Sequence, residues 1–574
     1  MMERRDSVQF SSKFATTYSR LFQGIPADQL APNHDLERFW SELLDLDVDR
    51  DFLAAKLNEA RKDDCLGKLK PFLNALVDAC IGTLRSEEAD DAKKGHAANT
   101  LGVVSRCLLS KNLAGWEVME LFAGGVSDSD RVFNGLTSAI DEVLGNTTLP
   151  ASLRHEVLQM AVIFVCGISQ LSPGAYFLRH DLFPSIVTTI TSPDTEQFTF
   201  EAALLLALLA NFHKSDAAKL NPYLRCIRET TNEDLMRGIC WAANFAAAAV
   251  VRAYQSISDD SSPSLTSTFG SLLSALRPDR ALAAKPVDPP RELFKNQPIE
   301  ACVILLPVFE FLHGSATFRK VFADNLTAHV EKKTSTPIPP LPITLLSLTS
   351  YLVSHASSSS SSRSIAYANL ALNMLLVMSE SDEILSALRA DTNEEIRLCR
   401  QELWRALILL LDFLASKLDS LTTTGGVEQL TQETLLLIDF ALCRSERLLP
   451  SPQTVHELVY EVVRSADVFR KQQALLDKLA NPHVDTHKRH SGSRPRAPQA
   501  LANITALAEQ YETKLKEAGV RSANQGLRAV AKEIEKDGLS YGTDLHGTDD
   551  PPKQSEDVVG FIRFAYADGM ALMP

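Results

Sequence analysis

Three short patterns in this sequence imitate sites that could do chemistry, and each lacks a residue that the chemistry needs. The segment His456-Glu457-Leu458-Val459-Tyr460 begins like the HExxH helix of zinc enzymes. In that helix the second histidine stands one turn after the first, on the same face, so that both bind the metal. Tyr460 occupies that position here, and we interpret the segment as an amphipathic helix.

Alternating aspartates imitate the start of a calcium-binding loop: Asp45, Asp47, Asp49 and Asp51. An EF-hand needs glycine at the sixth position of the loop for its turn and glutamate at the twelfth for bidentate ligation. Arg50 and Lys56 stand at those positions. The pattern therefore predicts a solvated helix end or an N-cap.

A histidine series, His483, His487 and His490, would align on one face of a helix. Lys488 and Arg489 lie within the series, and proline, glycine and serine flank it. This composition predicts a basic, histidine-rich linker over 481–498 and not a metal site. A contact of this linker with anionic lipid headgroups is the less favoured alternative.

A proline-rich stretch has the PxxP spacing of ligands for SH3 domains, at Pro337, Pro339, Pro340 and Pro342. No flanking Lys or Arg fixes an orientation, so we interpret it as a connector. The chain has no GxxxxGK[ST], GxSxG or CxxC motif and no GxGxxG after a strand. We therefore expect a protein that is not an enzyme, with no catalytic residue, cofactor or metal.

Composition excludes several classes of protein. The chain has 574 residues, 45% hydrophobic residues, 25 Gly and 27 Pro, which excludes collagen-like and broadly disordered chains. The formal net charge of −14 disfavours a nucleic-acid binder, because phosphate binding needs clustered Lys and Arg. The nine cysteines are widely spaced and most lie in apolar stretches, which indicates free buried thiols in a reducing compartment.

Targeting signals are not evident from the sequence. The first ten residues, MMERRDSVQF, lack the apolar region of a signal peptide. The longest apolar runs fall short of the roughly 20 mostly apolar residues that a spanning helix needs. We expect no transmembrane helix.

Helix-length segments that become apolar nearly all round recur along the chain. They begin at Ala97, His155, Phe200, Cys240, Ile365, Gln401 and Gln432. Such helices must be buried on every face, and shorter amphipathic helices, as at 36–46 and 50–60, lie between them. The spacing approximates the armadillo and HEAT period of about 40–47 residues. We predict an all-α fold, an irregular armadillo/HEAT-like α-solenoid with inserted disordered linkers, and we favour helix even at the β-branched segment 185–191.

Linker composition divides this solenoid. We expect N-terminal helical repeats over 8–256, a linker over 257–292, a C-terminal helical region over 293–480, the basic linker over 481–498, a helical segment over 499–538, and a linker with an apolar tail helix over 539–574. The six-serine run at 357–362 also reads as a linker. For the tail, a helix docked back on the end of the solenoid is favoured over a partner-binding or membrane anchor, with Ser555 as its cap.

Four ordered segments resemble one protein family. Residues 448–464 read LLPSPQTVHELVYEVVR, and 401–414 read QELWRALILLLDFL. Similar segments occur at 200–223 and at 18–44. Together they resemble the armadillo-like helical domain-containing protein family of animals and fungi. Residues that match its motifs are Phe39, Trp40, Asn221, Pro222, Tyr223, Trp404, Pro450, Pro452, Glu457, Leu458, Tyr460 and Glu461.

The resemblance spans roughly residues 10–480 and implies packing and turn roles for these residues, without a catalytic or ligand role. It departs from the animal pattern after Asn481, and we expect a fungal or other non-animal member. The family resemblance implies a cytoplasmic scaffold, peripheral at the Golgi, that acts in Golgi organisation and secretion through a phosphatidylinositol 4-kinase and an Arf guanine-nucleotide exchange factor. Membrane association would then come from partners.

Two other readings remain open. A soluble cargo receptor of importin-like architecture would carry an ordered series of Asn along its inner helices, and only scattered examples such as Asn211 and Asn244 occur. An enzyme would need a cleft with paired carboxylates of perturbed pKa.

The matched tryptophan provides a test of the packing interpretation. Trp404→Ala should lower the free energy of unfolding by roughly 3–5 kcal/mol, the usual loss for an aromatic side chain removed from a core. Thermal unfolding followed by circular dichroism measures this. Near-normal melting would mean that Trp404 is exposed, which makes it a candidate for partner contact.

Overall fold

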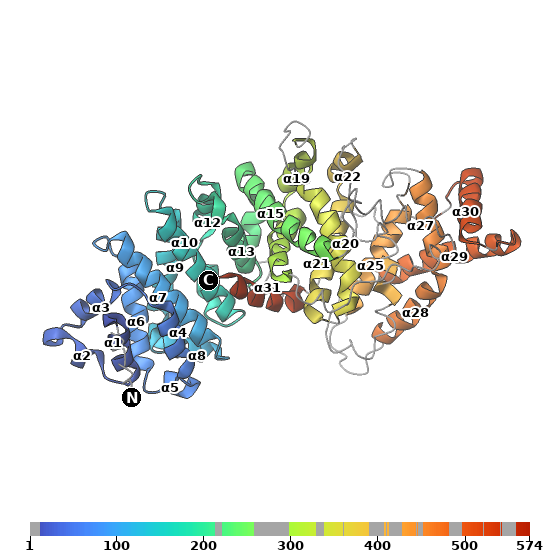
Figure 1. The fold of residues 1–574 in the computed structure, drawn as a ribbon. Helices are drawn as coiled ribbons and strands as arrows, with labels where there is room; N and C mark the ends of the chain where they lie inside the picture. Colours follow the sequence, from blue (N-terminus) through green and yellow to red (C-terminus); the bar gives the residue numbers. More distant parts are fainter. Residues whose placement is uncertain are drawn as a thin grey trace, which may run out of the picture. The chain divides into compact units, whose positions relative to one another are not determined.

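The computed structural model describes residues 12–212, 221–257, 298–328, 338–359, 361–389, 407–408, 410–412, 427–443, 445, 452–480, 496–520, 522–539, 541 and 558–574 (Figure 1). Every regular element in these ranges is a helix, so the predicted all-α, armadillo-like fold is confirmed. The chain forms two compact units, residues 1–242 with 562–574 and residues 243–561. We call them unit 1 and unit 2.

Unit 1 contains most of the N-terminal helices. They are α1 (Lys13–Phe22), α2 (Ala27–Leu30), α3 (Leu36–Leu44), α4 (Arg50–Glu59), α5 (Lys62–Leu66), α6 (Lys70–Arg85), α7 (Asp91–Leu109), α8 (Gly115–Ala123), α9 (Val126–Gly145), α10 (Ala151–Ile168), α11 (Gly174–Arg179), α12 (Phe183–Thr191), α13 (Thr199–Ala210) and α14 (Pro222–Glu229). Short 3₁₀ turns lie at Pro32–His34 and Glu196–Phe198. The helix α15 (Glu233–Ile257) begins in this unit, and α31 (Val558–Leu572) ends in it.

The helices of unit 1 stack with a period of three. One layer runs through α1, α4, α7, α10 and α13, each packed on the next, and a second runs through α3, α6, α9 and α12 (Figure 1). The short helices α5, α8 and α11 pack against the second layer. Three helices per repeat, with each repeat buried only against its neighbours, is the armadillo arrangement.

Burial follows from the apolar sequence of the first layer. All nine side chains from Ala202 to Ala210 in α13 have 0% exposure, and α10 buries residues on every side. Helices of the second layer are amphipathic instead, as in α3, where Phe39 and Trp40 face inward. The first layer is not uniform, because α4 belongs to it and buries only Leu53 and Leu57. The all-apolar pattern therefore marks the later helices of this layer.

Capping side chains set where several of these helices begin. Asp49 accepts a hydrogen bond from the Phe52 amide at 3.0 Å, which confirms the N-cap expected in the aspartate series. Asp35 and Asp90 cap α3 and α7 in the same way. An N-cap oxygen satisfies one of the amides that the first turn leaves unpaired.

A fully buried arginine closes the end of α9. Arg154 has 0% exposure, and its Nη2 donates to the Leu144 carbonyl at 3.2 Å, while Nη1 lies 3.9 Å from Asp194 Oδ2. Burial lowers the pKa of its guanidinium from the usual value. The buried charge is tolerated because it satisfies a carbonyl at a helix C-terminus.

Unit 2 contains the end of α15 and the C-terminal helices. They are α18 (Leu305–Gly314), preceded by a 3₁₀ turn at Ile299–Ile304, then α19 (Ala316–Ala328), α20 (Leu341–Ser359), α21 (Ser362–Glu380), α22 (Asp382–Arg389), α25 (Val427–Cys443), α27 (Pro452–Arg464), α28 (Ala466–Ala480), α29 (Arg496–Glu517) and α30 (Ala523–Asp537). The helix α21 packs on α18, α20 and α25, and α29 packs on α25, α27 and α28. Phe561, at the start of α31, makes an edge contact with Tyr367.

Two expectations on local structure have clear outcomes. Helix was correctly favoured over strand at 185–191, which lies in α12. The linker expected at 357–362 was wrong for most of its length, because α20 continues to Ser359 and α21 starts at Ser362. Serine is only moderately unfavourable in a helix, so a packed helix extends through it. Pro337, His483, His487 and His490 lie outside the described residues.

The cap of α14 offers a test of how unit 1 is held together. Asn221 Oδ1 accepts from the amides of Tyr223 and Leu224, and its Nδ2 donates to the Leu209 carbonyl at 2.9 Å. Asn221→Ala should lower the free energy of unfolding by about 1–3 kcal/mol, because a buried cap and a carbonyl partner are lost together. Urea unfolding followed by circular dichroism measures it. The matched variant Asn58→Ala, on an exposed position of α4, should have little effect, and equal effects of the two would contradict the assignment.

Candidate functional site

One cluster in unit 1 has the residue types of a hydrolase triad but not its arrangement. His180 Nε2 lies 3.1 Å from Asp141 Oδ2, and Ser185 Oγ donates to Asp141 Oδ1. In a nucleophilic triad the histidine takes the proton of the serine, and the carboxylate orients the histidine. Here the carboxylate holds both groups. The cluster therefore ties α9 to α12 and to the end of α11, and leaves the serine without a base.

The metal-like sequence patterns also have structural roles. Asp45 pairs with Lys93 at 3.0 Å, and Asp47 lies 3.4 Å from His96. His456 is buried within α27. Among the described residues no group of three or more His, Cys, Asp or Glu is placed to hold a metal ion.

The motif residues of unit 1 lie in its core. The ring of Trp40 packs edge-on against Phe39 and stacks near Phe72. Pro222 is the first residue of α14 after the Asn221 cap. Tyr223 is buried, its hydroxyl donates to the Phe177 carbonyl at 2.7 Å, and burial raises its pKa above the ordinary value.

The motif residues of unit 2 lie on and around α27. Pro452 is the first residue of that helix and is exposed, as is Glu457, whereas Leu458 is buried. Tyr460 packs against Gly526 of α30, so closely that a Cβ at that glycine would lie 2.6 Å from the ring. Glu461 pairs with Arg464 at 3.4 Å. Trp404 and Pro450 lie outside the described residues.

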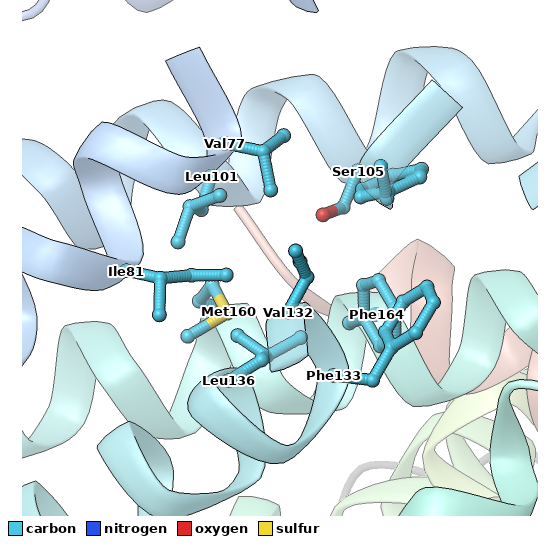
Figure 2. A pocket seen from close by; sticks show the side chains of 10 residues that line it. Val77, Ile81, Leu101, Ser105, Val132, Phe133, Leu136, Met160 and Phe164 are labelled. Atoms are coloured by element: carbon cyan, nitrogen blue, oxygen red, sulfur yellow. The ribbon is translucent and has the colours of Figure 1, made fainter. Parts of the chain in front are cut away.

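A small void lies between α6, α7, α8, α9 and α10. Figure 2 shows Val77, Leu101, Val132, Met160 and Phe164 around it, with Ser105 the polar side chain on its wall. Its volume is about 10 Å³. A water needs about that much room and two or more polar partners. The void is therefore a gap in core packing and too small for a ligand.

The C-terminal helix α31 packs closely on unit 1. It lies against the first layer, over α7, α10 and α13. Gly569 is the point of closest approach: a Cβ there would lie 2.8 Å from Cys166 Sγ and 3.4 Å from Leu204 Cδ2. Ile562, Ala565, Tyr566 and Met573 are buried. The tail helix is docked, as expected, and it lies on α7, α10 and α13, the last three helices of the first layer of unit 1.

Two half-buried polar side chains anchor this helix. Arg106 Nη2 donates to the carbonyls of Met570 at 3.2 Å and Met573 at 2.7 Å. These carbonyls belong to the end of α31, where a helix leaves its acceptors unpaired. Gln170 Nε2 donates to the Tyr566 hydroxyl at 2.8 Å and to the Asn211 carbonyl. We call Arg106, Cys166, Gln170, Leu204, Leu208 and Phe212 the tail site.

A larger pocket adjoins the tail site. It holds about 200 Å³ and is lined by residues of α4, α7 and α10 together with Pro574. Arg50 and Arg106 supply positive charge to it, Asp51 and Glu156 negative charge, and Gly102, Val103 and Ile163 apolar surface. We call it the Arg50 pocket. Its mixed lining suits a peptide better than a compact, highly charged ligand.

Two thiols near this surface are held in the neutral form. Burial raises the pKa of Cys166 far above its ordinary value, against a smaller opposing effect of Arg106. Burial also raises the pKa of Cys107, which lines the Arg50 pocket. A thiol attacks as its thiolate, so burial makes both cysteines weak nucleophiles at neutral pH.

Two helices among the described residues are long and apolar enough to cross a membrane by length and composition. They are α10 and the segment Glu233–Ser256 of α15, and the bent pair Ile299–Gly314 and Ala316–Leu326 would add a third if it counted as one span. The apolar runs of the sequence had suggested none. In unit 1, α10 packs against α7, α9 and α13, which is the burial that an apolar core helix needs.

The fold and the described surfaces define an all-α, armadillo-like helical-repeat protein. A family model described as the C-terminal region of armadillo-like helical domain-containing protein 3 matches residues 384–538, which include α25 and α27–α30. Residues 384–538 therefore carry the C-terminal region of this family, and the resemblance noted in the sequence is confirmed. This match supports a helical scaffold.

Three relatives carry the name armadillo-like helical domain-containing protein 3. The Danio rerio protein is 22% identical over 596 residues, covering 84% of this chain and 82% of the relative. The Xenopus laevis protein is 27% identical over 54% of this chain, and the Homo sapiens protein is 24% identical over 58%. Those two alignments cover 43% and 45% of the respective relatives.

Sequence reasoning did not find the tail site. Arg106 and Gln170 each follow an apolar run without any motif, and Cys166 read only as a buried thiol. One signal was available: Gly569 interrupts the apolar tail three residues after Tyr566, which is the spacing of neighbours on one helix face.

The burial of Cys166 predicts a chemical signature of tail docking. Cys166 should react slowly with N-ethylmaleimide at pH 8, because its raised pKa leaves little thiolate and α31 covers it. Tyr566→Ala should accelerate that reaction at least tenfold, since the ring and its bond to Gln170 are lost. Mass spectrometry of tryptic peptides gives both rates. Cys80, fully buried in α6, is the internal control, and equal acceleration at both cysteines would indicate general unfolding instead.

Proposed function

We propose that this protein is a non-enzymatic scaffold that holds partner proteins at Golgi membranes and acts in Golgi organisation and secretion. By family resemblance, the partners are a phosphatidylinositol 4-kinase and an Arf guanine-nucleotide exchange factor. The observation that carries the proposal is the match to the family's C-terminal region, 384–538, whose described helices α25 and α27–α30 pack on one another. Such arrays expose long, continuous surfaces that suit binding of other proteins.

Charge supports a route to the membrane through partners. The net charge of −14 is unfavourable for direct adsorption to anionic lipid, which attracts clustered Lys and Arg. The apolar residues of α31, which could have served as an anchor, are buried against unit 1. Stable anchoring takes two signals, and the partners would supply them.

The importin-like alternative receives less support from the asparagines that suggested it. Asn211 is buried, and its Nδ2 donates to the Ala207 carbonyl at 2.7 Å. Asn244 Nδ2 donates to the Pro339 carbonyl at 2.9 Å. Both side-chain amides bind the chain's own backbone, whereas a cargo groove would present them to a peptide.

Affinity purification of the full chain tests the scaffold proposal. The kinase and the exchange factor should be enriched at least tenfold over an unrelated armadillo-repeat protein of similar length and charge. Absence of enrichment for both would overturn the proposal. Binding of a purified lysine-rich peptide with micromolar affinity would favour the cargo-receptor alternative.

Localisation distinguishes partner-dependent recruitment from a tail anchor. Removal of residues 555–574 should leave Golgi association of the fluorescently tagged protein within about twofold of wild type, because recruitment comes from partners. Depletion of the partner that co-purifies should release the protein into the cytosol. Loss of Golgi association on removal of the tail alone would show that α31 is the anchor.

A further inference from the structure

The contacts at the tail site are of a kind that another chain could make. Arg106 binds main-chain carbonyls, which every helix presents at its C-terminus. Cys166 and Leu204 require only a residue without a side chain at one position. Gln170 requires one hydroxyl or carbonyl three residues earlier. The tail site therefore recognises a helix by three features: free carbonyls at its C-terminus, a small residue, and a hydrogen-bonding residue three positions before it. Other helices can have the same features as α31.

The surface extends further than α31 covers. The Arg50 pocket lies beside Pro574 and leaves about 200 Å³ unfilled. Arg106 belongs both to this pocket and to the tail site, so the two are continuous. A helix whose chain continues past its C-terminus could place a further side chain beside Arg50 and Asn99.

A displaced tail would stay attached because α31 belongs to the same chain, with residues 538–557 between it and α30 in the sequence. The polar anchors are not fully buried, so water can replace the bonds that Arg106 and Gln170 make to α31. A ligand in the same chain competes with a separate partner through its effective concentration, which the length of the connecting chain sets.

We propose that the tail site and the Arg50 pocket form a helix-binding site, which α31 occupies as an internal ligand and a partner protein enters by displacing it. The partner presents an apolar helix with a small residue against Cys166 and a hydrogen-bonding residue three positions earlier. Its chain continues beyond the helix into the Arg50 pocket. This inference deepens the proposed scaffold function by locating one of its binding sites.

A reversible lock gives the sharpest test. In Gly569→Cys the new Cβ lies close to Cys166 Sγ, at 2.8 Å, which suits a disulfide with its S–S bond of about 2.05 Å. The oxidised full chain should not bind a fluorescent peptide of residues 558–574, whereas the reduced form should bind it. Mass spectrometry verifies the Cys166–569 bond. Failure of the bond to form, or equal binding by both forms, would overturn the proposal.

A second variant opens the site permanently. The side chain introduced by Gly569→Leu collides with Cys166 and Leu204, so the full chain should bind the peptide at least tenfold more tightly than wild type, as measured by fluorescence anisotropy. Adding Arg106→Ala should weaken that binding about tenfold. Gly82→Leu is the matched control, because no atom lies within 4 Å of a Cβ there, and it should bind like wild type. A folded Gly569→Leu protein that binds no better than wild type contradicts the proposal.

Other occupants give different results in the same experiments. A dimer of the Gly569→Leu or reduced Gly569→Cys protein, seen by size-exclusion chromatography with light scattering and absent from the locked form, would mean that a second copy fills the site. A true partner should co-purify with the open variant but not with the locked one, and the 558–574 peptide should displace it. Because peptide binding uses the purified protein alone, it can succeed even if Golgi recruitment of the kinase fails.

Discussion

The structure depends on one constraint: helices that are apolar on all faces need neighbours on all faces. The helix α13 is the clearest case, with nine consecutive side chains at 0% exposure. One neighbouring helix covers only one side of such a helix. The layer α4–α7–α10–α13, the second layer beside it and the docked α31 together provide the remaining cover. Stacked three-helix repeats follow from this requirement, since each repeat contributes the face that the next one lacks.

The sequence was sufficient to predict the helix class and much of the layering. The apolar segments starting at Ala97, His155 and Phe200 lie in α7, α10 and α13, all members of one layer. Of the two amphipathic segments, 36–46 lies in the other layer, as α3, whereas 50–60 lies in the first layer, as α4. Periodicity is local information, so it identifies each helix and the face that it buries. The six-serine run shows the limit, because packing extended α20 where composition predicted a linker.

The candidate site could not be predicted because its contacts join distant parts of the chain. Arg106 and Met573 are separated by 467 positions, and Gln170 and Tyr566 by 396. Neither pair has a local pattern, since the arginine donates to a main-chain carbonyl and the glutamine to a tyrosine hydroxyl, and both acceptors are common groups. The motifs shared with the family did not indicate the contacts with α31 either. Asn221 and Tyr223 match the family and hold α14 in place. Leu204 and Leu208 lie in the same matched segment but indicated only a buried core, and Arg106, Cys166 and Gln170 belong to none of the matched segments.

The tail site combines tight shape with anchors that are easily replaced. Gly569 fits so closely against Cys166 that a methyl group at this position would collide with its sulfur. A steric fit of this kind selects a helix with a small residue here without burying a charge. Arg106 differs from Arg154 in this respect. Arg154 is fully buried and tied to α9, so loss of its carbonyl partner would leave a buried charge without water and with only the 3.9 Å contact to Asp194. Arg106 is half-buried and borders a pocket, so water can solvate it when the carbonyls of α31 leave. Arg154, whose carbonyl partner water cannot replace, therefore lies inside the layers. Arg106, whose carbonyl partners water can replace, lies at the surface where we propose that one helix exchanges for another.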